Sequence, residues 1–116
     1  MDLKSKLLNA TRKKRFESER YDICVDIREM TAQERVDMYT EAETAGKGNT
    51  AAIEQFFSTS LIIAGVLDPE TGNPVFTQAD AEAVHNMPGG LFNALSMAIA
   101  KLSGVDPEAV EQETKN

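Results

Sequence analysis

Acidic and amide side chains cluster in the stretch LDPETGNPVFTQADAEAV, residues 67–84, and their types are those that bind calcium. An EF-hand loop needs oxygen ligands at its first, third and fifth positions, glycine at the sixth and glutamate at the twelfth. A loop that begins at Asp68 has Gly72 fifth and Ala79 twelfth, whereas a loop that begins at Leu67 gains the glycine but loses its first ligand. Neither register supplies the ligand set, so we expect no metal site here.

The same stretch is better explained as a connection between two helices. Asp68 and the proline after it begin a turn, and the following Thr-Gly-Asn supplies residues that tolerate positive φ. Residues 74–76 are short, extended and apolar. Thr77 then caps a helix, with Asp80 three residues later in a variant of the capping box. The carboxylates are thus explained by turns and helix starts.

Other residues that could carry chemistry are few. The one histidine, His85, stands beside Asn86 ahead of a Pro-Gly-Gly break, and the one cysteine is Cys24. Base or thiol catalysis needs an orienting partner, and neither residue has one in a known pattern. The sequence has no nucleophile elbow, zinc-ligand spacing or dinucleotide fingerprint. We therefore expect a protein that is not an enzyme and uses no cofactor.

Length and composition further limit the class of protein. A chain of 116 residues is expected to form one domain. Its longest apolar run, residues 61–67, is too short to span a membrane, and no apolar signal core follows Met1. The single cysteine excludes an internal disulfide, which is compatible with a reducing cytoplasm.

Charge is distributed unevenly along the chain. Residues 1–20 hold seven Lys or Arg and three acids, a net +4, and the other 96 residues hold five bases and sixteen acids, a net −11. The acidic body would repel phosphates, so we expect no nucleic-acid partner. The basic arm contacts an acidic partner or the acidic body of a neighbouring copy, or it is simply a solvated terminus. Its core is Arg12, Lys13, Lys14 and Arg15.

The N-terminal third contains the strand signals. Clean alternation in YDICVDIREM predicts a β-strand with Tyr21, Ile23, Val25 and Ile27 on one face. The preceding RFESER is a weaker candidate for a partner strand. A short helix is expected earlier, in DLKSKLLNA, with its leucines near one face.

Helices are expected for most of the remainder. Thr31 and Glu34 form a capping box that starts a helix running to about Ala45. We expect this helix to lie on the surface, because its apolar stripe is narrow. The stripe consists of Val36, Tyr39 and Ala42.

Residues 50–67 are broadly apolar and predict the central core helix, in which Gly65 is either a close-packing contact or a point of fraying. Helices are also expected at about 78–86 and 91–102, with Gly104 ending the latter, and in DPEAVEQE. The fold is thus predicted to be mainly α, a small helical domain with a short N-terminal β-strand or hairpin. We expect a basic arm with a short helix (1–20), a helical domain (21–113) and a disordered tail (114–116).

The order of these segments resembles the tail assembly chaperones of long, non-contractile-tailed bacteriophages. The resemblance rests on SLIIAGVLDPETGNPVF, then TQADAEAVHNMPGGLFNALSMAIAKLSGV, then DPEAVEQETKN, with IREMTAQERVDMY similar to an early family segment. It covers about residues 20–116. The family often has a compact polar pattern such as Glu-Lys-Ser where this chain has HNMPGG.

The resemblance implies a role without catalysis. Such chaperones bind the long helical tape measure protein and keep it soluble in the host cytoplasm, and they leave before the tail is finished. A longer form, made by a programmed frameshift, carries an extra domain that recruits the major tail protein. Lys115-Asn116 after Thr114 is compatible with a slippery A-AAA-AAC heptamer, which is a hypothesis motivated by position.

The candidate partner-binding residues lie on the two apolar helices, 50–67 and 91–102, and just before the second. A partner helix would bind between these helices, and methionine suits such adaptable surfaces. The candidates are Phe57, Leu61, Met87, Phe92 and Met97. For Phe57 and Phe92 core packing is the stronger alternative, because large apolar residues are usually buried. We also expect self-association; the alternative function is a head–tail connector or head-completion protein, which would form a ring.

Overall fold

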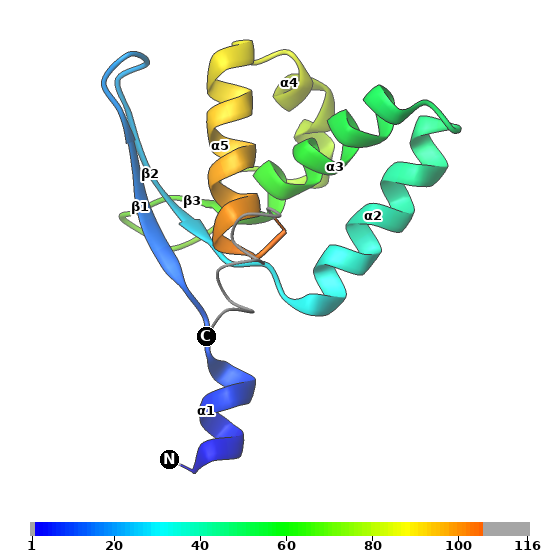
Figure 1. The fold of residues 1–116 in the computed structure, drawn as a ribbon. Coiled ribbons are helices and arrows are strands. Elements are labelled where there is room, and N and C mark those ends of the chain that lie inside the picture. The colour runs from blue at the N-terminus through cyan, green and yellow to red at the C-terminus, as the bar shows by residue number, and fades with distance from the viewer. Residues whose placement is uncertain (1, 106–116) are drawn as a thin grey trace.

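The computed structural model describes residues 2–105, which form five α-helices, one 3-10 turn and one three-stranded antiparallel sheet (Figure 1). The prediction of a mainly helical domain with an N-terminal hairpin is confirmed. The helix expected in DPEAVEQE and the tail at 114–116 lie outside the described residues. In chain order the elements are α1 (Leu3–Asn9), β1 (Lys13–Ser18), β2 (Ile23–Arg28), α2 (Ala32–Gly46), α3 (Thr50–Gly65), β3 (Val66–Leu67), η1 (Gln78–Asp80), α4 (Ala81–His85) and α5 (Gly89–Leu102).

The hairpin has the buried face that the alternation predicts, and its first strand, β1, overlaps the candidate partner segment RFESER. Phe16 of β1 pairs with Val25 of β2, and Ile27 at the end of β2 is 1% exposed while Cys24 on the other face is exposed. β3 pairs with the other edge of β2, with Ile27 opposite Val66. The sheet order is therefore β1-β2-β3, and β1 is an open edge.

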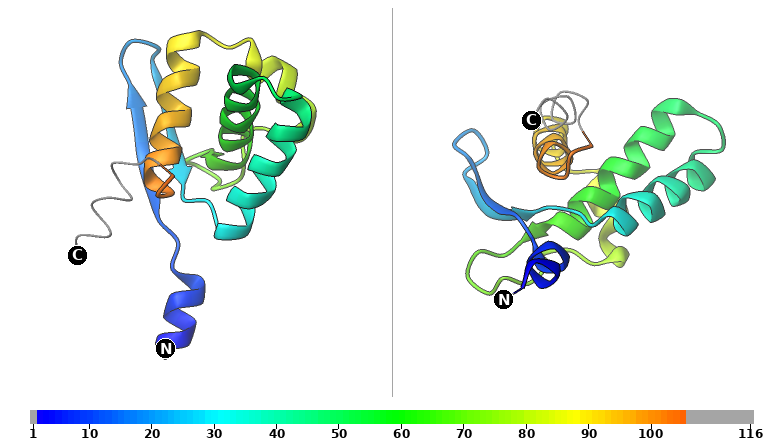
Figure 2. Two further views of the ribbon diagram at one scale, coloured as in Figure 1. Left: turned by 45° about the vertical axis from the view of Figure 1, so that its right-hand side comes forward. Right: turned by 60° about the horizontal axis from the view of Figure 1, so that its bottom comes forward.

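Helix α3 is the centre of the core, as predicted. Leu61 and Ile62 are almost fully buried, and α3 packs against α2, α4 and α5 (Figure 2). α5 lies between the hairpin and α3, while α2 covers the far side of α3. The helix ends two residues earlier than predicted, because Val66 and Leu67 pair with β2 instead and are buried there. Strand pairing and burial outweigh the helical continuation that the apolar run indicated.

The predicted apolar stripe of α2 is wrong in two of its three positions. Val36 and Tyr39 are 60% and 53% exposed, and the buried stripe is Met38, Ala42 and Gly46. Gly46 allows the close approach: a Cβ there would lie 2.5 Å from Ile53 Cγ1 of α3. The contact with α3 therefore rotates α2 so that Val36 and Tyr39 face outward while Met38 is buried.

The acidic stretch after β3 forms the turn and the helix start that the sequence predicts. Gly72 has φ +75°, and the Asp68 carboxylate accepts the Glu70 N–H at 2.8 Å within the turn. The Asp80 carboxylate accepts the Thr77 N–H at 2.8 Å and so helps to start η1 and α4. No group of three His, Cys, Asp or Glu in residues 2–105 is placed to hold a metal ion.

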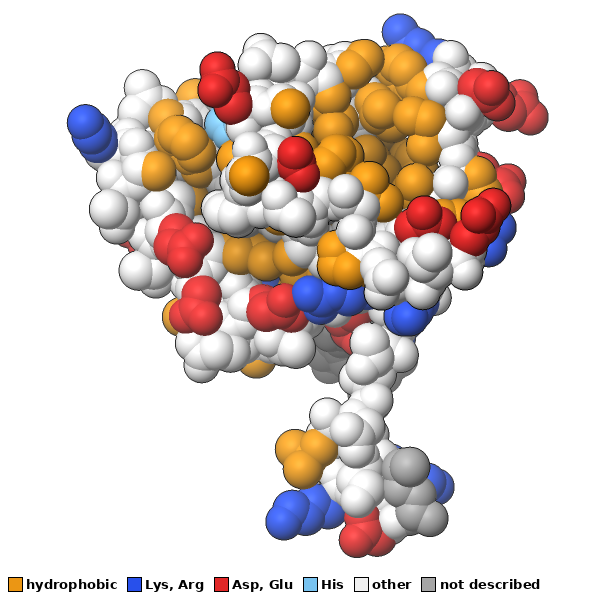
Figure 3. Space-filling model, turned by 180° about the vertical axis from the view of Figure 1, so that it is seen from behind, with side chains coloured by type: hydrophobic (Ala, Val, Ile, Leu, Met, Phe, Trp, Pro, Cys, Tyr) orange, Lys and Arg blue, Asp and Glu red, His pale blue; other side chains and the backbone are white. Residues whose placement is uncertain are grey.

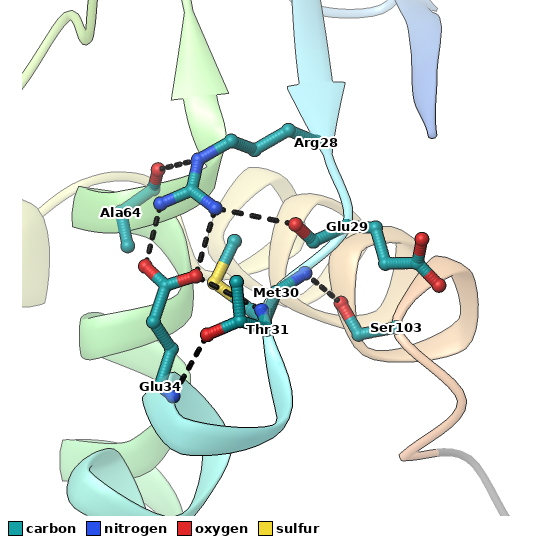
Figure 4. Close-up of polar contacts among 7 residues, drawn as sticks. All are labelled: Arg28, Glu29, Met30, Thr31, Glu34, Ala64 and Ser103. Carbon is teal, nitrogen blue, oxygen red and sulfur yellow. Dashed lines mark hydrogen bonds and ion pairs between the residues drawn. The ribbon is translucent and has the colours of Figure 1, made fainter. Parts of the chain in front are cut away.

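One arginine links the end of the hairpin to two helices (Figure 4). Arg28, the last residue of β2, donates from Nε to the Ala64 carbonyl at 3.1 Å, near the C-terminal end of α3. Its Nη1 and Nη2 donate to the two carboxylate oxygens of Glu34, at 2.9 and 2.6 Å, in the first turn of α2. A bidentate arginine–carboxylate pair fixes both position and orientation.

The capping box predicted from the sequence is part of the same network. Glu34 Oε1 accepts the Thr31 N–H at 2.9 Å, and the Thr31 hydroxyl accepts the Glu34 N–H at 3.1 Å. Nearby, the Met30 N–H donates to the Ser103 hydroxyl at 2.9 Å, which ties this junction to the C-terminal end of α5. The hydrogen bonds from Arg28, assisted by the Thr31 N–H, lower the pKa of Glu34 to about 2.

The low pKa of Glu34 gives a pH prediction. Because its pKa is about 2 in the folded protein and about 4.5 ordinarily, its contribution is complete above about pH 4.5 and is lost as the pH falls towards 2. We expect Glu34→Gln to lower the free energy of unfolding by about 1 kcal/mol near neutral pH. In urea unfolding at about pH 2.5, the difference in free energy of unfolding between this variant and wild type should be smaller. Glu41→Gln, an exposed site on α2, should stay within about 0.5 kcal/mol of wild type. A difference in free energy of unfolding that does not change with pH would contradict the low pKa of Glu34.

Gly65 is a close-packing contact and not a point of fraying. A Cβ at Gly65 would lie 2.9 Å from Ile99 Cδ1 and 3.0 Å from Ile99 Cγ2, and Ile99 is fully buried. We expect Gly65→Ala to destabilise the domain by about 1–3 kcal/mol through overpacking at the contact between α3 and α5. Gly89→Ala in the first turn of α5, where a Cβ meets nothing within 4 Å, should be neutral or slightly stabilising in the same thermal melts.

Candidate protein-binding surface

Two adjoining hollows form an open apolar surface where α2, α3 and α5 meet. Both are lined by Phe57 and Val105, and we call the two adjoining hollows together the apolar groove. The first, of about 360 Å³, is lined by Ala32, Arg35, Val36, Tyr39, Thr40, Phe57 and Val105. The second, of about 210 Å³, is lined by Phe57, Ser58, Leu61, Ser96, Met97, Ala100 and Val105.

The groove collects most of the large apolar side chains that the described part of the body leaves exposed. Outside α1, four such residues are exposed in residues 2–105, and three of them line the groove: Val36 (60%), Tyr39 (53%) and Met97 (66%). The fourth is Val75. Isolated exposed apolar residues are normal on a protein surface, but a contiguous set that lines a hollow marks a binding surface.

Aromatic packing connects the two halves of the groove. The rings of Tyr39 and Phe57 meet edge to face, with centroids 6.2 Å apart and planes at 72°. Phe57 is half-buried and packs against the core, so it anchors Tyr39 while one side remains available. An aromatic pair of this geometry stabilises the fold by about 0.5–1.5 kcal/mol beyond the burial of its apolar area, and it keeps the two rings in position.

The helix α2, which forms one wall of the groove, has a net negative charge, but none of its acids lines the groove. α2 carries four acids and one base, a net −3, and α3 adds a single acid, while α5 carries only Lys101. The one charged residue that lines the groove is Arg35, whose Nη1 donates to the Ser103 carbonyl at 3.3 Å. The surface therefore suits the apolar stripe of an amphipathic helix. Three of the four acids of α2 line a separate hollow. The acids of α2 are Glu34, Asp37, Glu41 and Glu43.

The structure brings together three of the five predicted partner-binding residues. Phe57, Leu61 and Met97 all line the second hollow of the groove. Leu61 is 1% exposed and belongs to the core, so it forms the floor of the groove, whereas Met97 is freely accessible. Whether any of them binds a partner stays a prediction.

The other two predicted residues lie in a different hollow. Met87 and Phe92 are half-buried and line a more polar depression of about 380 Å³ with Gln55 and His85. There the His85 Nδ1 is 3.1 Å from Gln55 Nε2, and its ring centroid is 5.4 Å from that of Phe56. An amide and an aromatic ring around a histidine do not provide the carboxylate orienter that a general base uses.

Sequence reasoning missed Val36 and Tyr39 as binding candidates. The sequence indicates them only as part of the narrow apolar stripe of α2, together with Ala42. The sequence does contain a signal for the packed face of α2. Met38, Ala42 and Gly46 also follow helical spacing, and two of them are small residues of the kind that allows close helix packing.

The predicted basic residues are exposed, and most of them lie on a strand. Arg12 precedes β1, and Lys13, Lys14 and Arg15 belong to it. Arg15 Nε pairs with the Asp26 carboxylate across the hairpin at 2.7 Å, which raises the pKa of Arg15. The other three make no ion pair among the described residues.

A second apolar region is visible from behind. Figure 3 shows hydrophobic side chains in a hollow on the side of the hairpin, with acidic side chains nearby. The apolar residues of the hairpin are half-buried and pack against the core: Phe16, Tyr21, Ile23 and Val25. Because these side chains already have partners, they are a weaker candidate than the exposed groove.

No described helix combines the length and apolar character needed to cross a lipid bilayer. This agrees with the short apolar runs of the sequence.

Comparisons with known proteins identify the fold. No family model matches the sequence, and no curated protein does. Among solved structures, the tail assembly chaperone of bacteriophage HK97 is similar, with a TM-score of 0.65 and 18% identity, over 84% of this chain and 94% of that chain. The similarity therefore confirms, at the level of fold, the resemblance found in the sequence.

The groove can be separated from the core by mutation. We expect Met97→Asp to change the free energy of unfolding by less than about 1 kcal/mol, because the side chain is 66% exposed. Leu61→Ala, directly beneath, should cost about 2–5 kcal/mol. Chemical denaturation of both variants measures the difference. A loss for Met97→Asp as large as that for Leu61→Ala would place Met97 in the core.

Proposed function

We propose that this chain is a phage tail assembly chaperone that binds the tape measure protein and keeps it soluble during tail assembly. The observation that carries the proposal is the exposed apolar groove, on a fold similar to that of the HK97 tail assembly chaperone. A tape measure protein presents long amphipathic helices, whose apolar stripes aggregate unless they are covered. A groove bounded by three helices offers such a stripe a helix-in-groove site.

The free energies of burial and of association indicate how tightly one groove can bind. Full burial of one large apolar side chain stabilises by about 1.5–3 kcal/mol, whereas association costs about 4–15 kcal/mol of lost freedom. Val36, Tyr39 and Met97 are already partly covered, so one groove gives only modest affinity. Many copies on one long helix gain affinity through multivalency, and each remains able to leave. Weak individual contacts suit a chaperone that acts in the host cytoplasm and is absent from the finished tail.

Charge supports solubility in the same scheme. Residues 21–116 carry a net −11, so a coated tape measure protein would present a strongly acidic exterior. Copies bound along one partner would repel other coated partners and limit aggregation.

A longer frameshifted form would recruit the major tail protein. A shift at Lys115-Asn116 would add its extra domain ten or eleven residues after Val105, which lines the groove (115 − 105 and 116 − 105). Eleven residues span at most about 40 Å when fully extended. The recruited tail protein would thus be delivered beside the bound tape measure helix.

Co-expression tests the proposal. The tape measure protein of the same phage should be insoluble alone and soluble with this chain, and the two should co-purify. Val36→Asp combined with Met97→Asp should abolish rescue while leaving the chaperone folded. Val75→Asp, exposed but outside the groove, should rescue like wild type. The proposal fails if the tape measure protein is insoluble in every case, or if the groove double variant rescues it fully.

A further inference from the structure

The chain turns back at the end of α5 and reaches the apolar groove. Gly104 has φ +74°, and its N–H donates to the Lys101 carbonyl at 3.2 Å. The N–H of Val105 donates to the Ala100 carbonyl at 2.9 Å. These two hydrogen bonds are those of a Schellman motif, in which the residue after the glycine packs against the last turn of the helix. Val105 is thereby held at the end of α5, where it lines both hollows of the groove.

The sequence after Val105 predicts a helix that begins at the groove. Asp106 is a good N-cap residue, Pro107 suits the first helical position, and Glu108 follows in the first turn. With this cap, Val105 precedes the cap and Val110 is the fourth residue of the helix. Apolar residues at these two positions commonly pack together as a hydrophobic staple, which fixes the direction of the helix. A staple here holds Val110 beside the groove, because Val105 already lines it.

The one charged residue that lines the groove favours an acidic occupant. Arg35 is half-buried and makes no ion pair within residues 2–105. Such a charge gains from a carboxylate partner, because burial removes part of the water that would solvate it. Residues 106–116 hold four acids and one lysine, a net −3. On a helix, Asp106 and Glu113 share a side with Val110, four positions before it and three after it. The segment thus combines an apolar side chain with carboxylates on one side.

We propose that residues 106–116 fold back over the apolar groove of their own chain. In this arrangement Val110 packs against Val36 and Tyr39, and a carboxylate of the segment pairs with Arg35. Eleven residues of helix are about 16 Å long, and they start beside the groove, so no linker is needed. The contact is intramolecular, so a small buried area is enough. The segment shields the groove until a tape measure helix displaces it; this regulatory role, unlike the cover itself, rests on the proposed function.

Paramagnetic relaxation in the full chain tests the cover. The exposed Cys24 is replaced by serine, and a nitroxide is attached to a cysteine introduced as Gln112→Cys. The label should broaden the NMR signals of Val36 and Met97, which line the groove. It should leave those of Tyr21 unchanged, because Tyr21 lies at the opposite end of α5. The broadening should not depend on protein concentration, since the contact is within one molecule.

Two variants of the labelled chain separate the apolar contact from the charge. Val110→Asp should lower the ratio of covered to open molecules at least about tenfold, and Arg35→Gln about twofold or more. Lys101→Gln removes a positive charge near the same end of α5 but outside the groove, so it should leave the broadening unchanged.

Three outcomes overturn the cover. The first is a labelled chain without broadening at the groove, and the second is broadening that survives Val110→Asp. The third is broadening that appears only as the concentration rises, because it would place the segment on another copy.

The regulatory role has its own readout. Val110→Asp leaves the groove intact and open, so it should solubilise the tape measure protein at a lower ratio of chaperone to partner than wild type does. Equal ratios, in a chain whose cover is seen by the broadening, would overturn the regulatory role alone. A groove double variant that still rescues the tape measure protein would instead contradict the proposed function.

Discussion

The position of Arg28 at the end of β2 is the constraint on which the arrangement of the helices depends. Its guanidinium is held by the Ala64 carbonyl near the end of α3 and by both oxygens of Glu34 at the start of α2. A partly buried charge needs such partners, because an unpaired one would be costly. Satisfying that requirement fixes the angle between the hairpin and the α2–α3 pair. The two helices that Arg28 contacts, α2 and α3, are two of the three that border the groove.

Local features of the fold could be predicted from the sequence because their causes are local. The capping box of Thr31 and Glu34, the alternation in β2 and the turn beginning at Asp68 each depend on residues at most five positions apart. The bond between Arg28 and Ala64 joins residues 36 positions apart, and no short pattern encodes it. The end of α3 was misplaced for the same reason, because the pairing of Val66 with Ile27 is a long-range contact.

The candidate site likewise contains some residues that could be predicted from the sequence and others that could not. Phe57 and Met97 could be proposed from helical spacing and residue type, and the structure places both in the groove. The exposure of Val36 and Tyr39 follows from the contact between Gly46 and Ile53, because the missing side chain lets α2 turn that face onto α3. A rule that places the largest apolar residues inside fails when a small residue decides which face approaches.

Within residues 2–105, β1 is an edge strand of the sheet, and this has a consequence if the chain binds an aggregation-prone partner as proposed. An unpaired strand edge can template further strands, and amyloid-like stacking begins there. The first three residues of β1 are Lys13, Lys14 and Arg15, and the opposite edge is blocked where Val66 accepts the Val75 N–H and Leu67 bridges to Pro74. Two such edges facing each other would bring six cations together. The cations of β1 and the paired edge of β3 therefore disfavour the addition of further strands at both edges of the sheet.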